Sequence, residues 1–376
     1  MESQELSLFL QPTSLKKRAE HGSDITRRCT MNHVGRLIAV GLQDKSICLL
    51  DAENGDVVQR FQDDALCTSL AFSPRGDIVA SGSVERVIKF WDIRTAECIA
   101  TLEGHTYPIL SLSFSPDGDR LVSGSGDTTL GIWDVDERKR MNTLKGHDLY
   151  VVTCDWDPAG NRIISGGVDA QIGIWNPTSQ KPIEMIREHR TAVKTVRFSR
   201  DGTKVASGSS DYSIVIWDSS DGKFEEEKSL LGHTDEVRAV SFSSDLRYLA
   251  SGSNDKAVFV WDLESATREG EAALIGEVDE IMWYPESKRF ISSDGAGVII
   301  RWEVKELEAF LRPFKDLLES IESDADGTKR EQHIQEFNEL RERYDERTLR
   351  DKRVFYVMWQ CKNALGLLKG RPRKVR

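Results

Sequence analysis

The sequence has few cysteines and no long apolar run. Its six cysteines are scattered through 376 residues without any Cys-x-x-Cys pair. This spacing favours reduced thiols in an intracellular compartment. No stretch approaches the roughly 18 apolar residues of a membrane-spanning helix, and the N-terminus MESQELSLFLQ lacks the basic start of a secretion signal. We therefore expect a soluble intracellular protein, with cytoplasm and nucleus both left open.

The common signatures of enzymes are missing as well. The chain contains no G-x-x-x-x-G-K-[ST] phosphate loop, no G-x-S-x-G nucleophile elbow and no H-E-x-x-H zinc motif. Acidic residues are numerous, but isolated pairs of carboxylates are the usual surface of an acidic protein. We predict no catalytic residues, no metal site and no cofactor.

A repeat of 41 to 44 residues is present instead. Each repeat ends in a Trp-Asp-like pair, and the pairs are Leu50-Asp51, Trp91-Asp92, Trp133-Asp134, Trp175-Asn176, Trp217-Asp218, Trp261-Asp262 and Trp302-Glu303. This period, with Gly-His early and Trp-Asp late, is typical of four-stranded propeller blades. Within one repeat, short β-prone runs from Ile109 to Leu144 alternate with turn residues, which predicts strands and not helices.

Four repeats share a histidine, a serine and an aspartate that stand 28, 10 and 6 residues before the tryptophan. The sets are His105, Ser123, Asp127 and Trp133; His147, Ser165, Asp169 and Trp175; His189, Ser207, Asp211 and Trp217; and His233, Ser251, Asp255 and Trp261. These residue types also make up a hydrolase triad. An enzyme needs one such site, however, whereas four copies at the same positions are what a repeated structural unit needs. We therefore interpret the sets as structural.

Over about residues 1–303 the sequence resembles the WD-repeat β-propeller family, because the spacing and the residue types agree together. The resemblance implies an all-β propeller of seven four-stranded blades. It also implies that the aspartate of a blade binds the histidine, the histidine binds the serine, and the serine binds the indole N–H. An N-terminal strand completes the last blade in this family, and Leu6–Leu10 is our candidate for it.

Repeats 1, 2 and 7 depart from the pattern. Repeat 1 has Leu50 in place of tryptophan, while repeats 2 and 7 have Asp63 and Leu274 at the histidine position. We expect packing to stabilise these three blades more than the hydrogen-bonded sets do. The longest repeat has its extra residues near Asp221–Lys228, where we expect a charged loop.

We divide the chain into the propeller at 1–303, an amphipathic helical extension at 304–369 and a basic tail at 370–376. Apolar residues recur at helical spacing from Leu307 to Ile321, with Pro313 either kinking this helix or starting another piece. After a linker at Ser323–Thr328, a second apolar stripe predicts a long helix up to about Lys369. The stripe either covers the propeller or docks on a partner. Its expected partner-binding residues are Leu307, Phe310, Phe314, Leu317, Phe355, Met358 and Leu365.

The propeller carries the net negative charge of the chain. The overall charge is −11, whereas 17 basic and 15 acidic residues lie from Glu303 onward. An acidic propeller repels phosphate, so basic protein partners suit it better than nucleic acid. The end of the tail, KGRPRKVR, resembles the Gly-Arg-Pro core of minor-groove DNA hooks, and this leaves nucleic-acid contact by the C-terminus as an alternative.

In the family that the sequence resembles, ligands most often meet the face around the central channel. The repeat positions that follow the histidine position give the partner-binding residues expected on this upper face: Arg27, Leu66, Tyr107, Leu110, Tyr150, Val152, Lys194, Glu236, Arg238, Glu277 and Asp279. Blades 2 to 4 supply an apolar and aromatic arc for a hydrophobic anchor. Glu236, Glu277 and Asp279 could hold an arginine or lysine of a peptide. The competing interpretation is an ordinary polar rim that binds nothing tightly.

The function that these features favour is a non-catalytic scaffold subunit of a larger intracellular complex. It would bind protein partners through the propeller faces and the C-terminal helices. Two alternatives remain at this point. One is a peptide-reading subunit, for substrate recognition or chromatin reading, that uses the upper face. The other is a nucleic-acid-associated factor anchored by the basic C-terminus.

Overall fold

The computed structural model describes residues 8–18, 25–285, 288–295, 297–323, 329–342, 358 and 361–362. The chain forms two compact units, one from Pro12 to Glu303 and one that combines Val304–Arg376 with Met1–Gln11. Neither of the two helices described here has the length and apolar character that a bilayer crossing requires.

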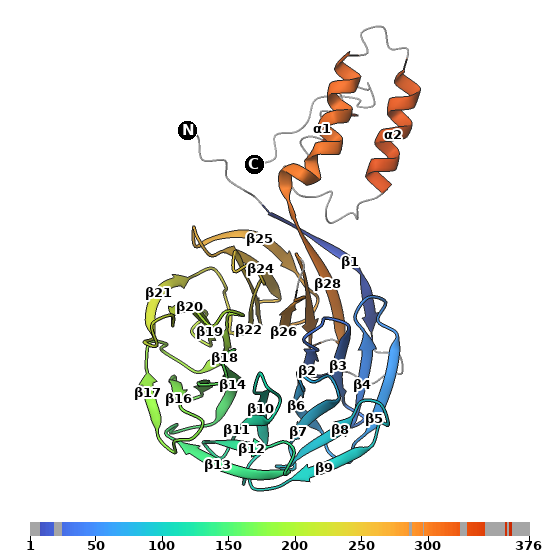
Figure 1. The fold of residues 1–376 in the computed structure, drawn as a ribbon. Helices are drawn as coiled ribbons and strands as arrows, with labels where there is room; N and C mark the ends of the chain where they lie inside the picture. The colour runs from blue at the N-terminus through green and yellow to red at the C-terminus, as the bar shows by residue number, and fades with distance from the viewer. Residues whose placement is uncertain are drawn as a thin grey trace. The chain divides into compact units, whose positions relative to one another are not determined.

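Seven four-stranded sheets form a ring in the first unit (Figure 1). From the channel outward, blade 1 contains β2 (Ile25–Met31), β3 (Leu37–Leu42), β4 (Ser46–Asp51) and β5 (Val57–Gln62), and blade 2 contains β6 (Cys67–Phe72), β7 (Ile78–Ser83), β8 (Ile88–Asp92) and β9 (Cys98–Leu102). Blade 3 contains β10 (Ile109–Phe114), β11 (Arg120–Ser125), β12 (Thr129–Asp134) and β13 (Lys139–Lys145), and blade 4 contains β14 (Val151–Trp156), β15 (Ile163–Gly167), β16 (Ile172–Trp175) and β17 (Pro182–Ile186). The predicted all-β, seven-bladed propeller is thereby confirmed.

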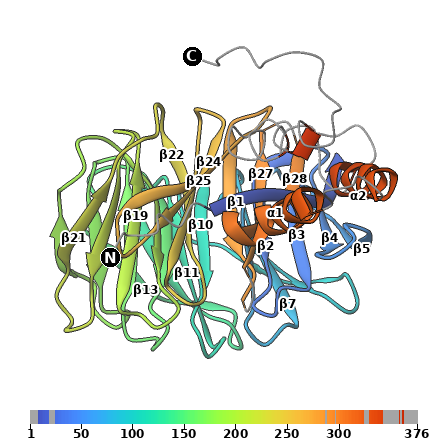
Figure 2. The same cartoon turned by 90° about the horizontal axis from the view of Figure 1, so that it is seen from above.

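The remaining blades follow the same order. Blade 5 contains β18 (Val193–Phe198), β19 (Lys204–Ser209), β20 (Ile214–Asp218) and β21 (Glu225–Leu230), and blade 6 contains β22 (Val237–Phe242), β23 (Tyr248–Ser253), β24 (Ala257–Asp262) and β25 (Thr267–Ala273). Blade 7 contains β26 (Val278–Trp283), β27 (Arg289–Asp294), β28 (Val298–Glu306) and, as its outer strand, β1 (Leu8–Arg18). The view turned by 90° shows the strands crossing the thickness of the ring, with the connecting loops along its two faces (Figure 2).

The outer strand of blade 7 comes from the other end of the propeller sequence. β1 starts at Leu8 and runs to Arg18, so it extends well past the expected strand Leu6–Leu10, whose first two residues lie outside the described part. The N-terminal strand thus completes blade 7 and pairs with β28, which would otherwise be the outer edge of this sheet.

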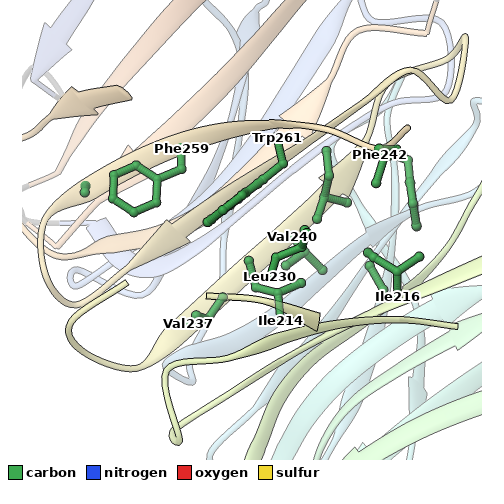
Figure 3. Packing of buried hydrophobic residues seen from close by; sticks show 12 residues of the cluster. Ile214, Ile216, Leu230, Val237, Val240, Phe242, Phe259 and Trp261 are labelled. Carbon is green, nitrogen blue, oxygen red and sulfur yellow. The ribbon is translucent and has the colours of Figure 1, made fainter. Parts of the chain in front are cut away.

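The core lies between neighbouring sheets. Between blades 5 and 6, for example, Ile214 and Ile216 of β20 pack with Val237 and Val240 of β22 and with Trp261 of β24 (Figure 3). All five are almost completely buried. Each buried aliphatic side chain contributes about 1.5–3 kcal/mol relative to exposure, so these layers provide most of the stability of the ring.

Ring closure also depends on polar contacts between blades 1 and 7. Glu53 accepts from Arg289 Nη1 at 3.0 Å and from Arg301 Nη1 at 2.7 Å. The Tyr284 hydroxyl donates to the Ala52 carbonyl at 2.7 Å. These residues are more than 200 positions apart in the sequence, and no repeat pattern could have paired them.

The charged stretch Asp221–Lys228 is only partly the loop that we expected. The structure has a turn up to Phe224, and β21 then begins at Glu225 and pairs with β20. β21 is the outer strand of its blade, and Glu225–Glu227 are exposed there. Charged side chains are compatible with a strand at such an edge, which explains the error.

The second unit contains α1 (Leu307–Ser323) and α2 (Arg330–Glu342). α1 runs through Pro313 as one helix, which decides between the two alternatives for this residue. Its buried core consists of Phe314, Leu317, Phe337, Leu340, Met358 and Cys361. Three of the expected partner-binding residues, Phe314, Leu317 and Met358, therefore pack inside this unit. The side chains of Leu307 and Phe310, and Phe355 and Leu365 altogether, lie outside the described residues.

Candidate functional site

Each of the four repeated residue sets forms a chain of hydrogen bonds. In blade 4, His147 Nδ1 lies 2.9 Å from Asp169 Oδ2, and His147 Nε2 lies 2.7 Å from Ser165 Oγ. Trp175 Nε1 donates to Ser165 Oγ at 2.8 Å. With a proton on Nδ1, the carboxylate, both ring nitrogens, the hydroxyl and the indole all have a partner. The set therefore ties the second and third strands of the blade to the loop that precedes its first strand.

The other three sets repeat this geometry. The distances from aspartate to histidine, from histidine to serine and from tryptophan to serine are 2.7, 2.7 and 2.8 Å in blade 3, 3.3, 2.8 and 2.9 Å in blade 5, and 2.9, 2.7 and 2.8 Å in blade 6. In blade 5 the ring of His189 also lies 3.2 Å from the Ser213 hydroxyl.

The aspartates of these sets remain ionised. Burial opposes their charge, but hydrogen bonds from the histidine, from hydroxyl groups and from backbone N–H groups outweigh it and hold the pKa of each below its ordinary value. Burial also lowers the pKa of His189 and His233, despite the neighbouring Asp211 and Asp255. The sets in blades 5 and 6 therefore combine a neutral imidazole with a carboxylate.

The four serines are placed where no substrate can reach them. All four are 0% exposed, and the hydroxyl oxygen of each accepts a hydrogen bond from an indole N–H. They are Ser123, Ser165, Ser207 and Ser251. A nucleophile must come within about 3–3.5 Å of its substrate. The geometry therefore supports a structural role for these sets.

Blades 2 and 7 keep part of the set, although their histidine is missing. Trp91 Nε1 donates to Ser81 Oγ at 2.9 Å, and Trp302 Nε1 donates to Ser292 Oγ at 2.8 Å. In blade 2, Asp63 at the histidine position accepts from Lys89 Nζ at 2.6 Å. The bond between indole and serine thus forms in these two blades without a histidine, and the expectation that packing contributes more to their stability stays a prediction.

Six of the inner strands have a β-bulge near the end that lies at the upper face. In β6, β10, β14, β18, β22 and β26 the pairing register shifts at the second residue. A bulge of this kind redirects a side chain. Among the expected upper-face residues, Leu110, Val152, Lys194 and Arg238 stand at these bulges and line a central cavity of about 480 Å³.

The charged side of the upper face is already paired within the chain. Lys194 Nζ lies 3.3 Å from Glu236 Oε2, and Arg238 Nε lies 3.5 Å from Asp279 Oδ1. Asp279 is buried and Glu277 is half-buried. The backbone of Arg27 belongs to β2, but its side chain lies outside the described residues.

One channel residue was missed by the sequence analysis. Asp155 accepts hydrogen bonds from Ser113 Oγ at 3.1 Å and from the Phe198 N–H at 3.0 Å. It therefore links blades 3, 4 and 5, and burial raises the pKa of its carboxyl. The signal in the sequence is a charged residue within a strand whose other residues are apolar except for Thr153.

The apolar side of the upper face is exposed. Tyr107 and Tyr150 are 53% and 49% exposed, and their ring centroids lie 6.4 Å apart. Leu149, Val84 and Val168 are also exposed, whereas Leu66 is half-buried. We call Val84, Tyr107, Leu149, Tyr150 and Val168 the apolar arc. The two tyrosines were predicted from the sequence, whereas Leu149 and the two valines were not. The valines lie in a different turn of each blade.

Three curated proteins show partial similarity to this chain. The U5 small nuclear ribonucleoprotein 40 kDa protein of Dictyostelium discoideum is 30% identical over 92 residues, which is 24% of this chain and 26% of that protein. Pre-mRNA-processing factor 19 homolog 2 of Arabidopsis thaliana is 28% identical over 90 residues, 23% of this chain and 17% of that protein. Pre-mRNA-processing factor 19 of Oryza sativa subsp. japonica is 28% identical over 83 residues, 21% of this chain and 16% of that protein. The matched part of this chain thus spans about a quarter or less of the length of these relatives.

The family model "WD domain, G-beta repeat" matches this chain in five segments. They are residues 55–92, 96–134, 138–176, 180–218 and 224–262, which together make up more than half of the chain. The matched segments end on the Trp-Asp-like pairs of blades 2 to 6, and four of those blades hold the complete hydrogen-bonded sets. The chain belongs to the WD40 repeat family.

Proposed function

We propose that the chain is a non-catalytic scaffold subunit that holds protein partners on the upper face of its propeller. The observation that carries this proposal is the apolar arc on blades 3 and 4 and the neighbouring turn of blade 2. Exposed apolar side chains that gather in one place mark interaction surfaces, whereas single ones are common on any protein. Tyrosines are favoured there because they offer a large contact area and a hydroxyl at low entropic cost.

The rigidity of the underlying blades supports the same proposal. The turns that carry Tyr107 and Tyr150 begin at His105 and His147, whose rings are fixed by the hydrogen-bonded sets. A binding surface on a rigid support loses less conformational entropy when a partner docks. The polar sets therefore serve binding indirectly, because they hold the arc in place.

The curated relatives support the scaffold proposal at a coarse level. Their names attach them to a small nuclear ribonucleoprotein and to pre-mRNA processing. The similarity extends over about 90 residues, which is roughly two blades at the spacing of this repeat. It therefore supports a shared blade architecture and does not transfer a partner or a compartment to this chain.

Capture of a basic peptide by the charged side has less support. Lys194 and Arg238 already pair with Glu236 and Asp279, so a peptide would have to displace them. The tail at 370–376 lies outside the described residues, and nucleic-acid contact by it stays a prediction.

The proposal is tested by comparing the proteins that co-purify with matched variants of the full chain. Tyr107→Asp with Tyr150→Asp places charge on the arc. Met141→Asp with Ile183→Asp is the control, because these residues are 54% and 60% exposed on outer strands of the same two blades. We expect the first variant to lose stoichiometric partners and the second to keep them. Equal capture by both variants would contradict the role of the arc.

A further inference from the structure

A cavity of about 560 Å³ lies where the turns of blades 1 and 7 meet, at the ends of the inner strands that point away from the upper face. We call the face that carries these turns the lower face. Arg36, Arg200 and Arg289 line the cavity, and Glu53 is the one acidic residue among the described residues of its lining. The lining therefore has an excess of positive charge, although the propeller as a whole is acidic.

Glu53 is already bound by arginines on both of its carboxylate oxygens. Oε1 lies 3.0 Å from Arg289 Nη1, and Oε2 lies 2.7 Å from Arg301 Nη1. A carboxylate held between two guanidinium groups has little capacity left for a third. Glu53 therefore leaves the charges of Arg36 and Arg200 uncompensated.

Arg36 and Arg200 are both exposed, and neither has an acidic partner within the described part of the chain. Arg200 Nη1 donates to the Pro285 carbonyl at 2.7 Å, which fixes its guanidinium group at the cavity. Asp201 adjoins Arg200 in the chain, but its carboxylate accepts hydrogen bonds from two hydroxyl groups of its own turn. Two arginines are thus available to an anionic ligand.

The turns of the other blades show that neither arginine is required for the turn itself. Arg36 follows the glycine of its turn, where blades 2 and 3 have Asp77 and Asp119. Arg200 is the second residue of its turn, where four other blades have proline. The same turns therefore form with acidic or neutral residues at these positions, and the fold does not explain the two arginines.

The cavity is built on ordered backbone. A side chain added at Gly35 would come within 2.8 Å of Pro285 Cδ, so the turn of blade 1 lies directly against blade 7. The Arg36 N–H donates to Asn32 Oδ1 at 2.8 Å and fixes this turn. Val34 is 53% exposed and forms an apolar part of the wall together with Pro285. Docking on such a support costs little conformational entropy of the backbone.

A phosphate monoester matches this charge better than a single carboxylate. With three arginines and one glutamate, the lining keeps two positive charges, and a phosphorylated serine or threonine carries about −1.5 to −2 at pH 7. Guanidinium groups also bind phosphate in bidentate geometry. Nucleic acid offers phosphate too, but a long polyanion is repelled by the acidic propeller much more than a short segment with one phosphate.

We propose that this cavity binds a phosphorylated serine or threonine in a linear segment of a partner protein, with Arg36 and Arg200 on the phosphate and an apolar neighbour of that residue against Val34. The inference goes beyond the proposed function, because the apolar arc lies on the opposite face. It gives the propeller a second docking site, and occupation of this site depends on phosphorylation of the partner.

The test measures capture of the full chain by three immobilised mixtures of short peptides. Phosphoserine, serine or glutamate is fixed at the central position, and the flanking positions vary. We expect the phosphoserine mixture to capture the chain at least about tenfold better than the serine mixture, with glutamate in between. Arg36→Gln combined with Arg200→Gln should reduce capture by phosphoserine by at least about tenfold, or 1.4 kcal/mol.

Arg94→Gln combined with Arg138→Gln is the matched control. Both residues are exposed in turns on the lower face of blades 2 and 3. Arg138 donates to a backbone carbonyl, that of Ile99, as Arg200 does at the cavity. The control therefore removes the same charge and should capture phosphoserine like the parent chain. If the first double variant is unstable in urea, Arg36→Lys with Arg200→Lys keeps the charge and should still weaken capture, because bidentate contact is lost.

Three results would overturn the proposal. They are equal capture by the phosphoserine and serine mixtures, equal losses in the two glutamine double variants, and binding of single-stranded RNA that depends on Arg36 and Arg200 without capture by phosphoserine. The last result would assign the cavity to nucleic acid. Tyr107→Asp with Tyr150→Asp should leave phosphoserine capture unchanged, so failure of the apolar arc and failure of the cavity are distinguished.

Discussion

Blades 3 to 6 and blade 2 each hold a tryptophan at the equivalent position of the repeat, but the polar groups around it differ. In blades 3 to 6 the serine that holds the indole is backed by a histidine and an ionised aspartate. In blade 2 the serine holds Trp91 without a histidine, and the ion pair between Lys89 and Asp63 lies beside it. The bond between indole and hydroxyl is therefore the shared element of these blades, and it forms in blade 2 without a histidine.

The charge of these groups also decides how a blade responds to a substitution. In blades 5 and 6, a neutral histidine that loses its carboxylate is still an uncharged group, whereas Asp63 that loses Lys89 is a charge in a nearly closed site. The Asp63 side chain is 1% exposed and that of Lys89 is 14% exposed. Removing one member of a buried ion pair is costly because the other charge stays behind.

The largest effect is therefore expected from Lys89→Met. We predict a loss of about 3–5 kcal/mol in the free energy of unfolding, measured by urea denaturation. Lys89→Met combined with Asp63→Asn should recover most of this loss, because asparagine keeps an acceptor for the N–H groups of Asp64 and Ala65. A double variant that is as unstable as the single one would show that the ion pair is not the cause.

The second-largest effect is expected when the serine that binds the indole is replaced by alanine, and it should differ between blades 4 and 2. Ser165→Ala leaves the indole of Trp175 and the ring of His147 without their shared partner, and we expect it to cost about 1–3 kcal/mol. Ser81→Ala removes only the partner of Trp91, and about half of that loss is expected. Equal losses in urea denaturation would mean that the histidine adds nothing to the set.

The fold class and the repeated sets could be predicted because they depend on spacing. The position of His105, Ser123, Asp127 and Trp133 in one repeat recurs in three others, and the strands follow from alternating residues. This information lies within each blade, so the several repeats of a single chain are sufficient to detect it.

The remaining features depend on contacts between distant parts of the chain. The substitute ion pair of Lys89 with Asp63, the bonds of Glu53 with Arg289 and Arg301, and the channel position of Asp155 have no repeated pattern.

The pH dependence of stability should come from blades 5 and 6. Because the pKa values of His189 and His233 are lowered in the folded chain, the unfolded chain takes up protons first as the pH falls. Stability is then complete above the ordinary histidine pKa of about 6.5 and declines below it. The lowered aspartate pKa values add a second loss below about pH 4. Lys89 of blade 2 does not add to the slope in the histidine range, because Asp63 and Asp64 raise its pKa against the effect of burial. Asp64 adds to the loss at low pH, because its hydrogen bond with Lys89 lowers its pKa.

Urea denaturation at pH 7.5, 6.0 and 5.0 measures this slope. The double variant His189→Gln and His233→Gln should be less stable at pH 7.5 and should show a flatter decline toward pH 5.0. A parent chain whose stability is constant or increases over this range would contradict the assignment of neutral imidazoles.

The smallest effect concerns a feature that both kinds of blade share. Arg86 in blade 2 and Lys256 in blade 6 are exposed and occupy the same turn with φ values of 68° and 67°. Arg86→Gly and Lys256→Gly relieve a left-handed conformation, and each should raise the free energy of unfolding by roughly 0.5 kcal/mol. If one substitution raised the free energy of unfolding and the other lowered it, the two blades would differ in more than their polar sets.

The most direct test of the whole account measures stability and binding together on two variants of blade 4. Ser165→Ala should lower the free energy of unfolding while the folded fraction still captures partners like the parent chain. Tyr150→Asp should leave the free energy of unfolding unchanged and lose partner capture. Loss of capture by folded Ser165→Ala with retention by Tyr150→Asp would contradict the assignment of the polar sets to stability and of the apolar arc to binding.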